Sequence, residues 1–375
     1  MPQELRLRLG MLGGGSFGHF AVQELTKLPG VALVAMAETR REASHVLARR
    51  LGIPLLGSAR ELVARDDVDW VYVATPPILH REHVTAALAA GKHVLCEKPL
   101  ALDLESADQM LSLAASKGVL LTTNLMQRYG AFFDPVQAIV REGLLGKFLH
   151  GSFENYASDE GLHPDHWFWD RSKSGGIFVE HSVHFFDLLA GWFGEGRVVA
   201  AQRSLRDRSG LEDQVNCTVR YPDGGLATFY HGFTQQSSAE RQSLRLGFER
   251  GDLLLEDWIP TSLRLRGIVD TSGASALRRL LPEAKVEVRE RYQGDAARKL
   301  IRHRPFEASE RLELVVAGAS KSDRYSQALR CLFSDQVRRL RDPAYVPRLT
   351  EANGRASLAL AVEASRLASE QSAEA

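Results

Sequence analysis

The sequence predicts an α/β protein in which a doubly wound parallel sheet is followed by an α+β domain with a large, mostly antiparallel open sheet. Three observations support this prediction. Strand and helix patterns alternate over residues 1–123, and parallel strands need such crossover helices. Residues 71–74 are almost continuously apolar, which is typical of a sheet covered on both faces. In residues 124–375, candidate strands follow one another through short turns, which favours antiparallel pairing.

The N-terminal elements are predicted from apolar residues that recur with a period of about 2 in strands and about 3.6 in helices. Polar and apolar residues alternate over residues 5–9, so a strand is expected to run to residue 12. The elements expected after it are helix 17–28, strand 31–37, helix 40–51, helix 59–64, strand 70–75, helix 79–90, strand 93–96, helix 104–117 and strand 119–122.

The C-terminal part is predicted to mix helices with strands, and Asp223 and Gly224 mark a turn between two of these strands. The expected elements are helices 134–142, 177–193 and 352–369, and strands 214–221, 226–233 and 244–255. The last helix is rich in alanine and amphipathic, so we expect it to pack against the body of the protein. The basic stretch 262–308 shows no period that assigns it to helix or strand.

The composition is that of an ordinary globular protein with room for two domains: 375 residues, 44% hydrophobic and 25% charged. A formal net charge of zero argues against a general attraction to nucleic acid or to an acidic membrane. No apolar run approaches the ~20 residues of a membrane span, and no signal-peptide pattern precedes the first strand. Three scattered cysteines suit free thiols in a reducing compartment, so we expect a cytoplasmic protein.

A glycine-rich hexapeptide between the first strand and the first helix fits the pattern G-x-G-x-x-G. Gly13 is expected to allow a tight turn, Gly15 to let a pyrophosphate approach, and Gly18 to permit close helix–strand packing. The helix N-terminus offers unpaired N–H groups to phosphates, so Ser16 and Phe17 are predicted cofactor contacts as well. Alternatively, the loop is a glycine turn of a flavodoxin-like fold that binds no dinucleotide.

An acidic residue, Glu38, ends the second predicted strand twenty residues after Gly18. A carboxylate at this place accepts hydrogen bonds from the adenosine ribose and repels a 2′-phosphate, which favours NAD. Arg40 and Arg41 follow and would instead suit the 2′-phosphate of NADP, so this alternative stays open. Thr39 and Arg40 are predicted to contact the cofactor together with Glu38.

The third predicted strand of the sheet ends in a rigid turn that begins with Thr75 and Pro76. It lies at the carboxyl edge, where open α/β sheets bind their ligands, so both residues are predicted cofactor contacts. Alternatively, the turn only ends the strand.

These features and several later motifs resemble the Gfo/Idh/MocA family of glucose–fructose oxidoreductase, inositol dehydrogenase and rhizopine-catabolism proteins. The residues that carry the resemblance are the glycine motif, the turn Thr75, Pro76 and Pro77 with His80 after it, the motif Glu97, Lys98 and Pro99, the run Ser174, Gly175 and Gly176 leading to His184 and Asp187, and the alanine-rich C-terminal helix. The resemblance spans most of the chain except residues 262–321, which we interpret as an insertion that caps the site or an interface.

The resemblance implies a Rossmann domain over residues 1–123 and a domain for substrate binding and oligomerisation over residues 124–375. It implies a substrate among sugars, cyclic polyols and their derivatives, and a homodimer or homotetramer, because the family's open sheet often forms a subunit interface. Lys98 and His184 would line the reacting centre. His80, Glu97 and Lys98 would contact the cofactor.

The chain departs from the family pattern just before His184. The family usually has an aspartate four residues before this histidine and a glycine two before it, where this chain has Glu180 and Ser182. Residues four apart share a helix face, so Glu180 and His184 can act together. The additional His181 points to a neighbouring face, and we predict that it contacts the substrate.

Oxidation of a secondary alcohol needs a hydride acceptor, a base, and a donor to the oxygen on which negative charge develops. NAD fills the first role. His184 is the predicted base, because imidazole titrates near neutral pH, while Glu180 orients it or binds a sugar hydroxyl. Lys98 is predicted to donate to the reacting oxygen. Alternatively, Lys98 itself is the base.

A loop rich in histidine and tryptophan lies between the two main motifs, and we expect part of it to close over the substrate. Aromatic faces stack on sugar rings, and charged neighbours bind hydroxyl groups. The predicted substrate contacts are His166, Trp167, Trp169 and Arg171, with Asn124 and Arg128 after the last Rossmann strand. Alternatively, this is a packed loop with a hydrophobic anchor. Two histidines three residues apart are no metal motif by themselves, so we predict no metal.

The leading hypothesis is therefore an NAD-dependent dehydrogenase that acts on a secondary hydroxyl of a sugar, polyol or sugar derivative. A second is a redox-neutral enzyme that oxidises a glycoside transiently, eliminates the aglycone and returns the hydride, as some members of the family do. A third is a nicotinamide-sensing regulator without catalysis, against which the retention of Lys98 and His184 argues.

Overall fold

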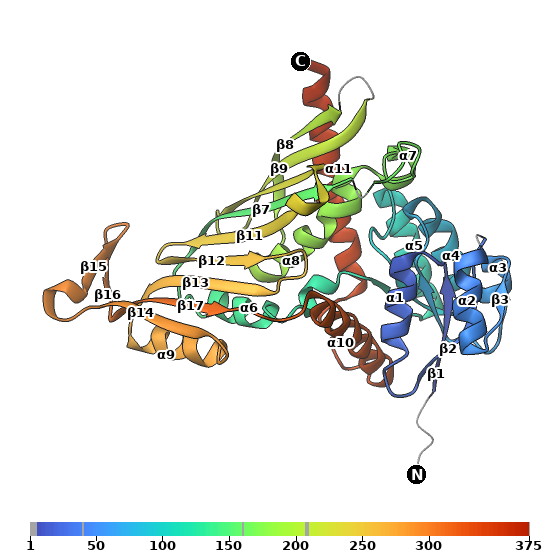
Figure 1. Cartoon of the computed structure of the whole chain (residues 1–375), viewed down its shortest axis with the longest axis horizontal. Coiled ribbons are helices and arrows are strands. Elements are labelled where there is room, and N and C mark those ends of the chain that lie inside the picture. The colour runs from blue at the N-terminus through green and yellow to red at the C-terminus, as the bar shows by residue number, and fades with distance from the viewer. Residues whose placement is uncertain (1–5, 40, 160, 207–209, 375) are drawn as a thin grey trace, which may run out of the picture. The chain divides into compact units, whose positions relative to one another are not determined.

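The computed structural model describes residues 6–39, 41–159, 161–206 and 210–374, and the chain forms two compact units (Figure 1). Unit 1 consists of Met1–Tyr129, Pro164–Asp187 and Ser326–Val362, and unit 2 of Gly130–His163, Leu188–Tyr325 and Glu363–Ala375. Two later segments thus belong to the unit that begins with the N-terminal residues. The predicted domain boundary after residue 123 stays a prediction.

Unit 1 is built on a six-stranded parallel sheet with the order β3-β2-β1-β4-β5-β6. Its strands are β1 (Leu7–Leu12), β2 (Val31–Ala37), β3 (Leu55–Leu56), β4 (Trp70–Val73), β5 (His93–Cys96) and β6 (Leu121–Thr123). All four residues of β4 are buried, as expected for a strand covered on both faces. The order reverses between β1 and β4, and open sheets bind ligands at such a switch point. The predicted doubly wound parallel sheet is confirmed.

The helices that connect these strands begin and end where capping side chains and glycines place them. They are α1 (Ser16–Leu25), α2 (Arg41–Leu51), α3 (Ala59–Val63), η1 (Pro77–Leu79), α4 (His80–Ala89) and α5 (Leu104–Lys117). Asp103 caps α5 by accepting a hydrogen bond from Ser106 N at 2.7 Å, and Gly118 ends it in the left-handed conformation. The predicted bounds of β2, β5 and α5 agree with the structure to the residue.

Two C-terminal helices also contribute to unit 1. Helix α10 (Lys321–Arg341) was not predicted, although Leu329, Leu332 and Phe333 recur at helical spacing. Phe333 packs edge-on against the buried Trp70 of β4, with 5.2 Å between ring centroids. In α11 (Glu351–Glu374), which was predicted over residues 352–369, a Cβ at Gly354 would meet Thr123 Oγ1 at 2.1 Å. This helix therefore lies directly on the end of β6.

Unit 2 contains a nine-stranded sheet with the order β14-β17-β13-β12-β11-β7-β10-β9-β8. The strands are β7 (Phe148–Ser158), β8 (Arg197–Arg206), β9 (Leu211–Arg220), β10 (Leu226–Gln235), β11 (Arg241–Phe248), β12 (Gly251–Glu256), β13 (Ser262–Val269), β14 (Lys285–Arg291) and β17 (Glu310–Val316). Every pair is antiparallel except β7 with β10. The predicted mostly antiparallel sheet is confirmed.

One predicted strand of this sheet was wrong. Residues 244–255 form a hairpin of β11 and β12, because the chain reverses at Glu249 and Arg250. Gly251 follows the turn, and a Cβ there would lie 2.1 Å from the carbonyl oxygen of Arg266 on β13. A glycine is thus needed where the backbones approach most closely. The polar residues Glu249, Arg250 and Asp252 around it interrupt the apolar pattern, and this turn signal was overlooked.

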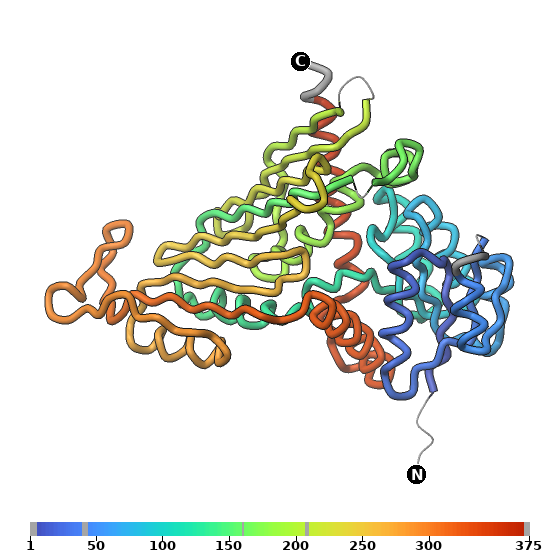
Figure 2. Tube along the Cα trace, in the orientation of Figure 1, coloured from blue at the N-terminus to red at the C-terminus, as the bar shows by residue number. Residues whose placement is uncertain are grey.

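The unassigned stretch 262–308 supplies the edge of this sheet. It contains β13, α9 (Thr271–Leu280) and β14, followed by η6 (Gly294–Ala297) and the hairpin of β15 (Arg298–Ile301) and β16 (Arg304–Glu307). Figure 2 shows this hairpin as an orange projection beyond β14. The remaining helical elements of unit 2 are α6 (Phe133–Arg141) and η5 (Ser237–Ala239). Unit 1 also contains η2 (Met126–Tyr129), α7 (Arg171–Ser174) and η3 (Phe178–Ser182). Helix α8 (Val183–Phe193) begins in unit 1 and ends in unit 2.

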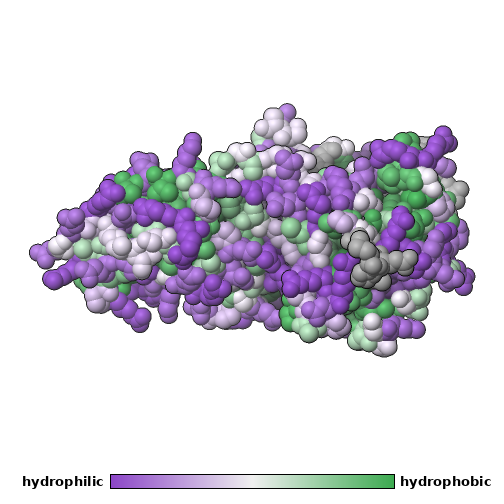
Figure 3. All heavy atoms as spheres, turned by 90° about the horizontal axis from the view of Figure 1, so that it is seen from below, coloured by the Kyte–Doolittle hydropathy of each residue, from purple (hydrophilic) through white to green (hydrophobic). Residues whose placement is uncertain are grey.

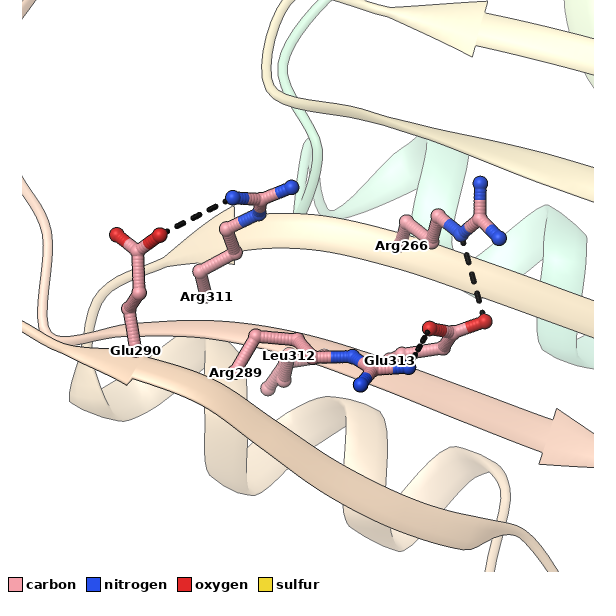
Figure 4. Close-up of a pocket in the computed structure, with 6 residues that line it drawn as sticks. All are labelled: Arg266, Arg289, Glu290, Arg311, Leu312 and Glu313. Atoms are coloured by element: carbon pink, nitrogen blue, oxygen red, sulfur yellow. Dashed lines mark hydrogen bonds and ion pairs between the residues drawn. The ribbon is translucent and has the colours of Figure 1, made fainter.

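One face of the nine-stranded sheet is charged where β13, β14 and β17 meet. On β13, Leu263 and Leu265 are buried and alternate with the exposed Arg264 and Arg266. A pocket on this face is lined by Arg266, Arg289, Glu290, Arg311, Leu312 and Glu313 (Figure 4). Hydrophilic side chains cover most of the surface drawn in Figure 3. Within the described residues, no helix combines the length and apolarity needed to cross a bilayer.

Candidate active site

The glycine loop between β1 and α1 is fixed by the packing of its first and last glycines. Gly13 has a φ of 92°, and a Cβ there would lie 2.4 Å from the carbonyl oxygen of Ala74. A Cβ at Gly18 would lie 2.7 Å from Met11 Cε, so α1 packs tightly on β1. In contrast, a Cβ at Gly15 would meet no atom within 4 Å. The chain itself therefore gives no reason for a glycine at position 15.

The middle glycine of the loop, Gly14, contacts residues that sequence reasoning missed. A Cβ there would lie 2.0 Å from Ser44 Oγ and 2.8 Å from Glu38 Oε2, so the Glu38 carboxylate lies against the loop. Ser44 is fully buried and lies 3.1 Å from Nε2 of His19. A methyl group at this x position of the glycine motif would have to displace the ends of both side chains, a contact that the pattern does not show.

These residues fit a dinucleotide. The N-terminus of α1 begins after Gly15, whose neighbourhood is open and which provides no side-chain cap, so its N–H groups remain available to a phosphate. The Glu38 carboxylate at the end of β2 is placed for ribose hydroxyls, and Thr39 Oγ1 donates to it at 3.3 Å. Arg40, the predicted contact to a 2′-phosphate, lies outside the described residues.

The turn after β4 is held by a buried histidine. His80 is fully buried, with Nε2 at 2.8 Å from the carbonyl oxygen of Thr75 and Nδ1 at 2.7 Å from that of Pro99. Burial lowers the pKa of His80 to about 4, although both carbonyls favour the charged ring. A neutral ring donates to only one of these carbonyls, whereas the charged ring donates to both and joins the turns that follow β4 and β5. Its contact with the cofactor stays a prediction.

The glutamate side chain of the Glu-Lys-Pro motif points into the protein interior. Glu97 is buried and accepts hydrogen bonds from Tyr72 OH at 2.5 Å and Asn124 Nδ2 at 2.7 Å. Burial raises the pKa of Glu97, an effect that the two donors and the nearby Lys98 oppose. Asn124, which was predicted to contact the substrate, thus uses its amide nitrogen to hold Glu97.

The lysine of the same motif reaches the helical segment that begins near residue 178. Lys98 Nζ donates to the backbone oxygen of Glu180 at 2.8 Å and also to Oε1 of the Glu180 carboxylate. The second carboxylate oxygen of Glu180 lies 3.0 Å from Nε2 of His181. The structure therefore brings three of the predicted site residues into direct contact, and two of the three N–H donors of Lys98 are used by Glu180.

A π-helical turn, η3, presents these groups. η3 (Phe178–Ser182) precedes α8, so the backbone is wider here than the α-helix that the sequence predicted for residues 177–193. Such turns are rare and occur frequently at functional sites. His184 follows η3 in α8 and is buried, with about 5% of its surface exposed. The turn explains why spacing arguments for an α-helix do not describe the geometry around Glu180.

Arg128, a predicted substrate contact, is part of a buried ion pair. Its Nε donates to Asp187 Oδ2 at 2.7 Å, and Asn353 Nδ2 donates to Asp187 Oδ1 at 3.2 Å. Burial raises the pKa of Asp187 to about 6, against the opposing effect of Arg128. Sequence reasoning noted Asp187 only within a motif and missed Asn353, because their contact joins residues 166 positions apart.

The aromatic loop packs partly on itself. Trp169 is buried, and its backbone N–H donates to the carbonyl oxygen of His166 at 3.0 Å. Trp167 is half-buried with its ring beside that of His166, and Arg171 opens the short helix α7. Contact of these residues with a substrate stays a prediction. In the described part of the chain, no group of three histidine, cysteine or acidic side chains is arranged to hold a metal.

A parallel sheet with a glycine turn, an acidic group at the end of β2 and a lysine–carboxylate pair defines a Rossmann-type oxidoreductase. Residues 7–125 match the model of an oxidoreductase family with an NAD-binding Rossmann fold, and residues 133–254 match the GFO/IDH/MocA C-terminal domain. The chain belongs to the Gfo/Idh/MocA family of NAD-binding oxidoreductases. The resemblance predicted from the motifs and the NAD-binding Rossmann domain are thus confirmed.

Several relatives carry functional names. The 1,5-anhydro-D-fructose reductase of Ensifer adhaerens is 34% identical over 232 residues, which cover 60% of this chain and 69% of the relative. The scyllo-inositol 2-dehydrogenase (NAD(+)) of Bacillus subtilis (strain 168) is 26% identical, with 59% and 66% covered. The structure of levoglucosan dehydrogenase in complex with NADH and L-sorbose superimposes with a TM-score of 0.75, at 18% identity and 97% coverage of both chains. The structural match shows the fold.

Proposed function

We propose that the protein moves a hydride between NAD and a secondary hydroxyl group of a sugar, cyclic polyol or related derivative. The observation that carries the proposal is the environment of Lys98. Two of its N–H donors bind Glu180, and the third has no partner among the described residues. The names of the reductase of an anhydrosugar and the dehydrogenase of an inositol support the substrate class.

In this proposal, Lys98 binds the reacting oxygen. Its ammonium group is held at a defined place by Glu180, and its third N–H donates to the substrate oxygen on which negative charge develops during oxidation. Such a preorganised donor contributes most in a site shielded from water. The side chain of Lys98 is 17% exposed, which leaves it shielded but open to a ligand.

His184 is the proposed base that takes the hydroxyl proton. Imidazole titrates near neutral pH and can accept a proton without a large energetic cost. NAD, when bound, accepts the hydride that leaves the carbinol carbon. In the reverse direction His184 returns the proton and Lys98 stabilises the same oxygen. Glu180 holds Lys98 in place.

The cofactor is proposed to contact the glycine loop and the carboxyl ends of the neighbouring strands. The proposed contacts are Gly13, Gly15, Ser16, Phe17, Gly18, Glu38, Thr39, Thr75, Pro76, Glu97 and Lys98. His80 supports the turn that carries Thr75. The substrate is proposed to contact His166, Trp167 and Arg171. Asn124 instead holds Glu97, Arg128 pairs with Asp187, and the buried Trp169 donates its backbone N–H to His166.

A reducing compartment such as the cytoplasm is the proposed location, supported by free thiols at Cys96, Cys217 and Cys331. A homodimer or homotetramer is the proposed assembly. The open nine-stranded sheet supports this proposal, because the family's open sheet often forms a subunit interface and closed symmetric oligomers pair the same surface twice.

The direct test incubates the purified protein with NAD and a panel of sugars, cyclic polyols and glycosides. Reduced-nicotinamide absorbance and product formation by NMR are followed together. Reduced cofactor that rises in step with an oxidised product supports the proposal. Consumption of a glycoside without reduced cofactor would instead establish the redox-neutral hypothesis, which the names of the reported relatives do not support.

Lys98→Met removes the proposed donor to the substrate oxygen. We expect kcat/KM to fall about 10²–10³-fold. The exposed Lys117 at the end of α5 provides the control Lys117→Met, which should retain wild-type kinetics. A loss below threefold for Lys98→Met would remove Lys98 from the mechanism.

Gly15→Ala separates cofactor binding from folding. The added methyl meets no atom of the chain, so the free energy of unfolding should change by about 1 kcal/mol or less. The methyl occupies the proposed path of the pyrophosphate, so NADH should bind at least about tenfold more weakly. Gly13→Ala is the matched comparison, because its methyl meets Ala74 and should destabilise the fold itself. Unchanged NADH binding by Gly15→Ala would contradict the proposed cofactor position.

A further inference from the structure

The space beside Gly14, where another residue would carry its Cβ, is bordered by two side chains of unit 1. Oε2 and Cγ of Glu38 lie 2.8 and 3.3 Å from the position of that Cβ, and Oγ of Ser44 lies 2.0 Å from it. These distances are below the ~3.5 Å of ordinary non-bonded contacts. The carboxylate of Glu38 can therefore lie against the loop as it does only while position 14 has no side chain.

The Ser44 side of this space is fixed more firmly than the Glu38 side. Ser44 lies in α2 and is fully buried, and its Oγ lies 3.1 Å from Nε2 of His19 in α1. Rotation of the hydroxyl would break this contact inside the protein, which costs free energy. Glu38 is half-buried, and three side-chain torsions let its carboxylate move outwards. A group added at position 14 therefore displaces Glu38 more readily than Ser44.

The same cluster brings the charge of Glu38 close to His19. Burial lowers the pKa of His19, against the opposing effect of the Glu38 charge. The carboxylate thus lies near the first turn of α1, whose N–H groups we place at the pyrophosphate. A carboxylate held at this place is within one nucleotide's reach of the adenosine ribose.

The position of this carboxylate decides which cofactor it admits. NADH presents the ribose hydroxyls, from which a carboxylate accepts hydrogen bonds, whereas NADPH carries a phosphate on the 2′ oxygen. A carboxylate that could swing away would lose the hydrogen bonds and would also stop repelling the phosphate. Selection of NAD over NADP therefore requires that the carboxylate be held in place.

We propose that Gly14 is a specificity-determining residue that keeps the Glu38 carboxylate against the loop, beside the fixed Ser44, and thereby selects NAD over NADP. The inference rests on the proposed contact between the cofactor and Glu38. The sequence alone leaves NADP open, because Arg40 and Arg41 follow Glu38. The inference assigns the choice to a contact within the glycine motif.

The experiment measures the dissociation constants for NADH and NADPH by fluorescence titration of the purified full-length protein. We expect the wild type to bind NADH at least about tenfold more tightly than NADPH. Gly14→Ala should weaken NADH about tenfold and change NADPH less than about threefold, because the ribose contact is lost. Gly15→Ala is the matched comparison. Its methyl lies on the proposed path of the pyrophosphate, which both cofactors share, so it should weaken both equally.

A double-mutant cycle tests whether Gly14 acts through Glu38. In the Glu38→Gln background, which lacks the charge, Gly14→Ala should change the ratio of the two dissociation constants less than about twofold. In the Ser44→Ala background, the missing hydroxyl leaves room for the methyl, so most of the preference for NADH that Gly14→Ala removes should return. Ser116→Ala, at an exposed serine of α5, is the control and should bind both cofactors as the wild type does.

Several outcomes would overturn the proposal. Equal weakening of both cofactors by Gly14→Ala would show that its methyl obstructs the shared pyrophosphate. An unchanged preference in Gly14→Ala, the same loss in the Glu38→Gln background, or a wild type that binds both cofactors equally would also contradict it. Failure of Ser44→Ala to restore the preference would remove the role of the space beside Gly14.

A second measurement needs no variant and therefore holds even where Gly14→Ala does not fold. In a crystal structure of the wild type with NADH, we expect the Glu38 carboxylate to lie against Gly14 and to accept a hydrogen bond from a ribose hydroxyl. A carboxylate turned away from the loop overturns the inference.

None of these measurements needs a substrate, so they separate the inference from the proposed function. The expected cofactor preference without turnover of any substrate supports the inference and contradicts the proposed hydride transfer alone. Turnover of a substrate together with an unchanged preference in Gly14→Ala contradicts the inference alone.

Discussion

Two regions of the molecule, one in each unit, differ in how they hold charge. At the candidate site in unit 1, Lys98 with Glu180 and Arg128 with Asp187 form ion pairs whose side chains are between 2% and 17% exposed. On the charged face of the nine-stranded sheet in unit 2, Arg311 and Glu290 form a pair at 3.1 Å with 57% and 49% exposure. The site pairs join segments far apart in the sequence, whereas Arg311 and Glu290 face one another across neighbouring strands.

The solvent exposure of an ion pair decides how much the stability of the fold depends on it. Water and salt screen an exposed pair, whose loss costs little. A buried pair is different, because removal of one partner leaves the other charge without compensation in a medium that solvates it poorly. The comparison therefore predicts that substitutions of similar chemistry have very unequal effects in the two units.

The largest effect on stability is expected for Arg128→Met. The change leaves the buried Asp187 with Asn353 as its polar partner, and it should lower the free energy of unfolding by about 3–5 kcal/mol near pH 7. Urea denaturation followed by circular dichroism measures the change. Arg141→Met, at a side chain that is 71% exposed, is the control. Equal effects of the two substitutions would remove the contrast between buried and exposed charge.

The next effect depends on pH. The folded-state pKa of His80 is lowered to about 4 from 6.5, so the unfolded chain takes up a proton between these values that the folded chain does not. Stability is fully present above pH 6.5 and is lost as the pH falls towards 4. The loss amounts to about 3 kcal/mol.

His80→Gln should abolish this contribution. The stability difference between the wild type and His80→Gln should therefore shrink by about 3 kcal/mol between pH 7 and pH 4. The difference between the two proteins removes the contribution of Asp187, because both contain it. The raised pKa of Asp187 makes the fold more stable as the pH falls over part of this range. Parallel stability curves for the two proteins would show that His80 does not titrate in this way.

The smallest effect is expected for Arg311→Gln in unit 2. Both partners of the Arg311–Glu290 pair are about half exposed, so the free energy of unfolding should change by less than about 1 kcal/mol and the change should shrink in 1 M salt. Thermal unfolding at low and high salt measures both quantities. A loss comparable with that of Arg128→Met would mean that this face is shielded from solvent in the assembled protein.

Local patterns predicted much of the fold. The bounds of β2, β5 and α5 follow from uninterrupted apolar patterns and from clear caps such as Asp103 and Gly118. Two elements were predicted less well. The charged turn between β11 and β12 was taken as part of one strand, and the apolar residues of helix α10 are separated by many charged residues.

The sequence predicted which types of residue form the site, but not which of them contact one another. Residue types at motif positions indicated a dinucleotide and an acid–base pair, and the family and its NAD-binding domain are confirmed. The contact of Lys98 with Glu180 joins positions 82 apart through a π-helical turn, and no local period shows such a pairing. The same holds for Asn124 and Arg128, whose partners Glu97 and Asp187 are distant in sequence.

The division of unit 1 among three chain segments sets an order for its synthesis. The last strand of the parallel sheet ends at Thr123, 210 residues before Phe333, which packs against Trp70 of the same sheet. At about 5–20 residues per second, roughly 10–40 s separate the two events on the ribosome. For that time the nascent sheet lacks the helix that will cover Trp70, so its apolar side is open to chaperones or to premature association with neighbouring nascent chains.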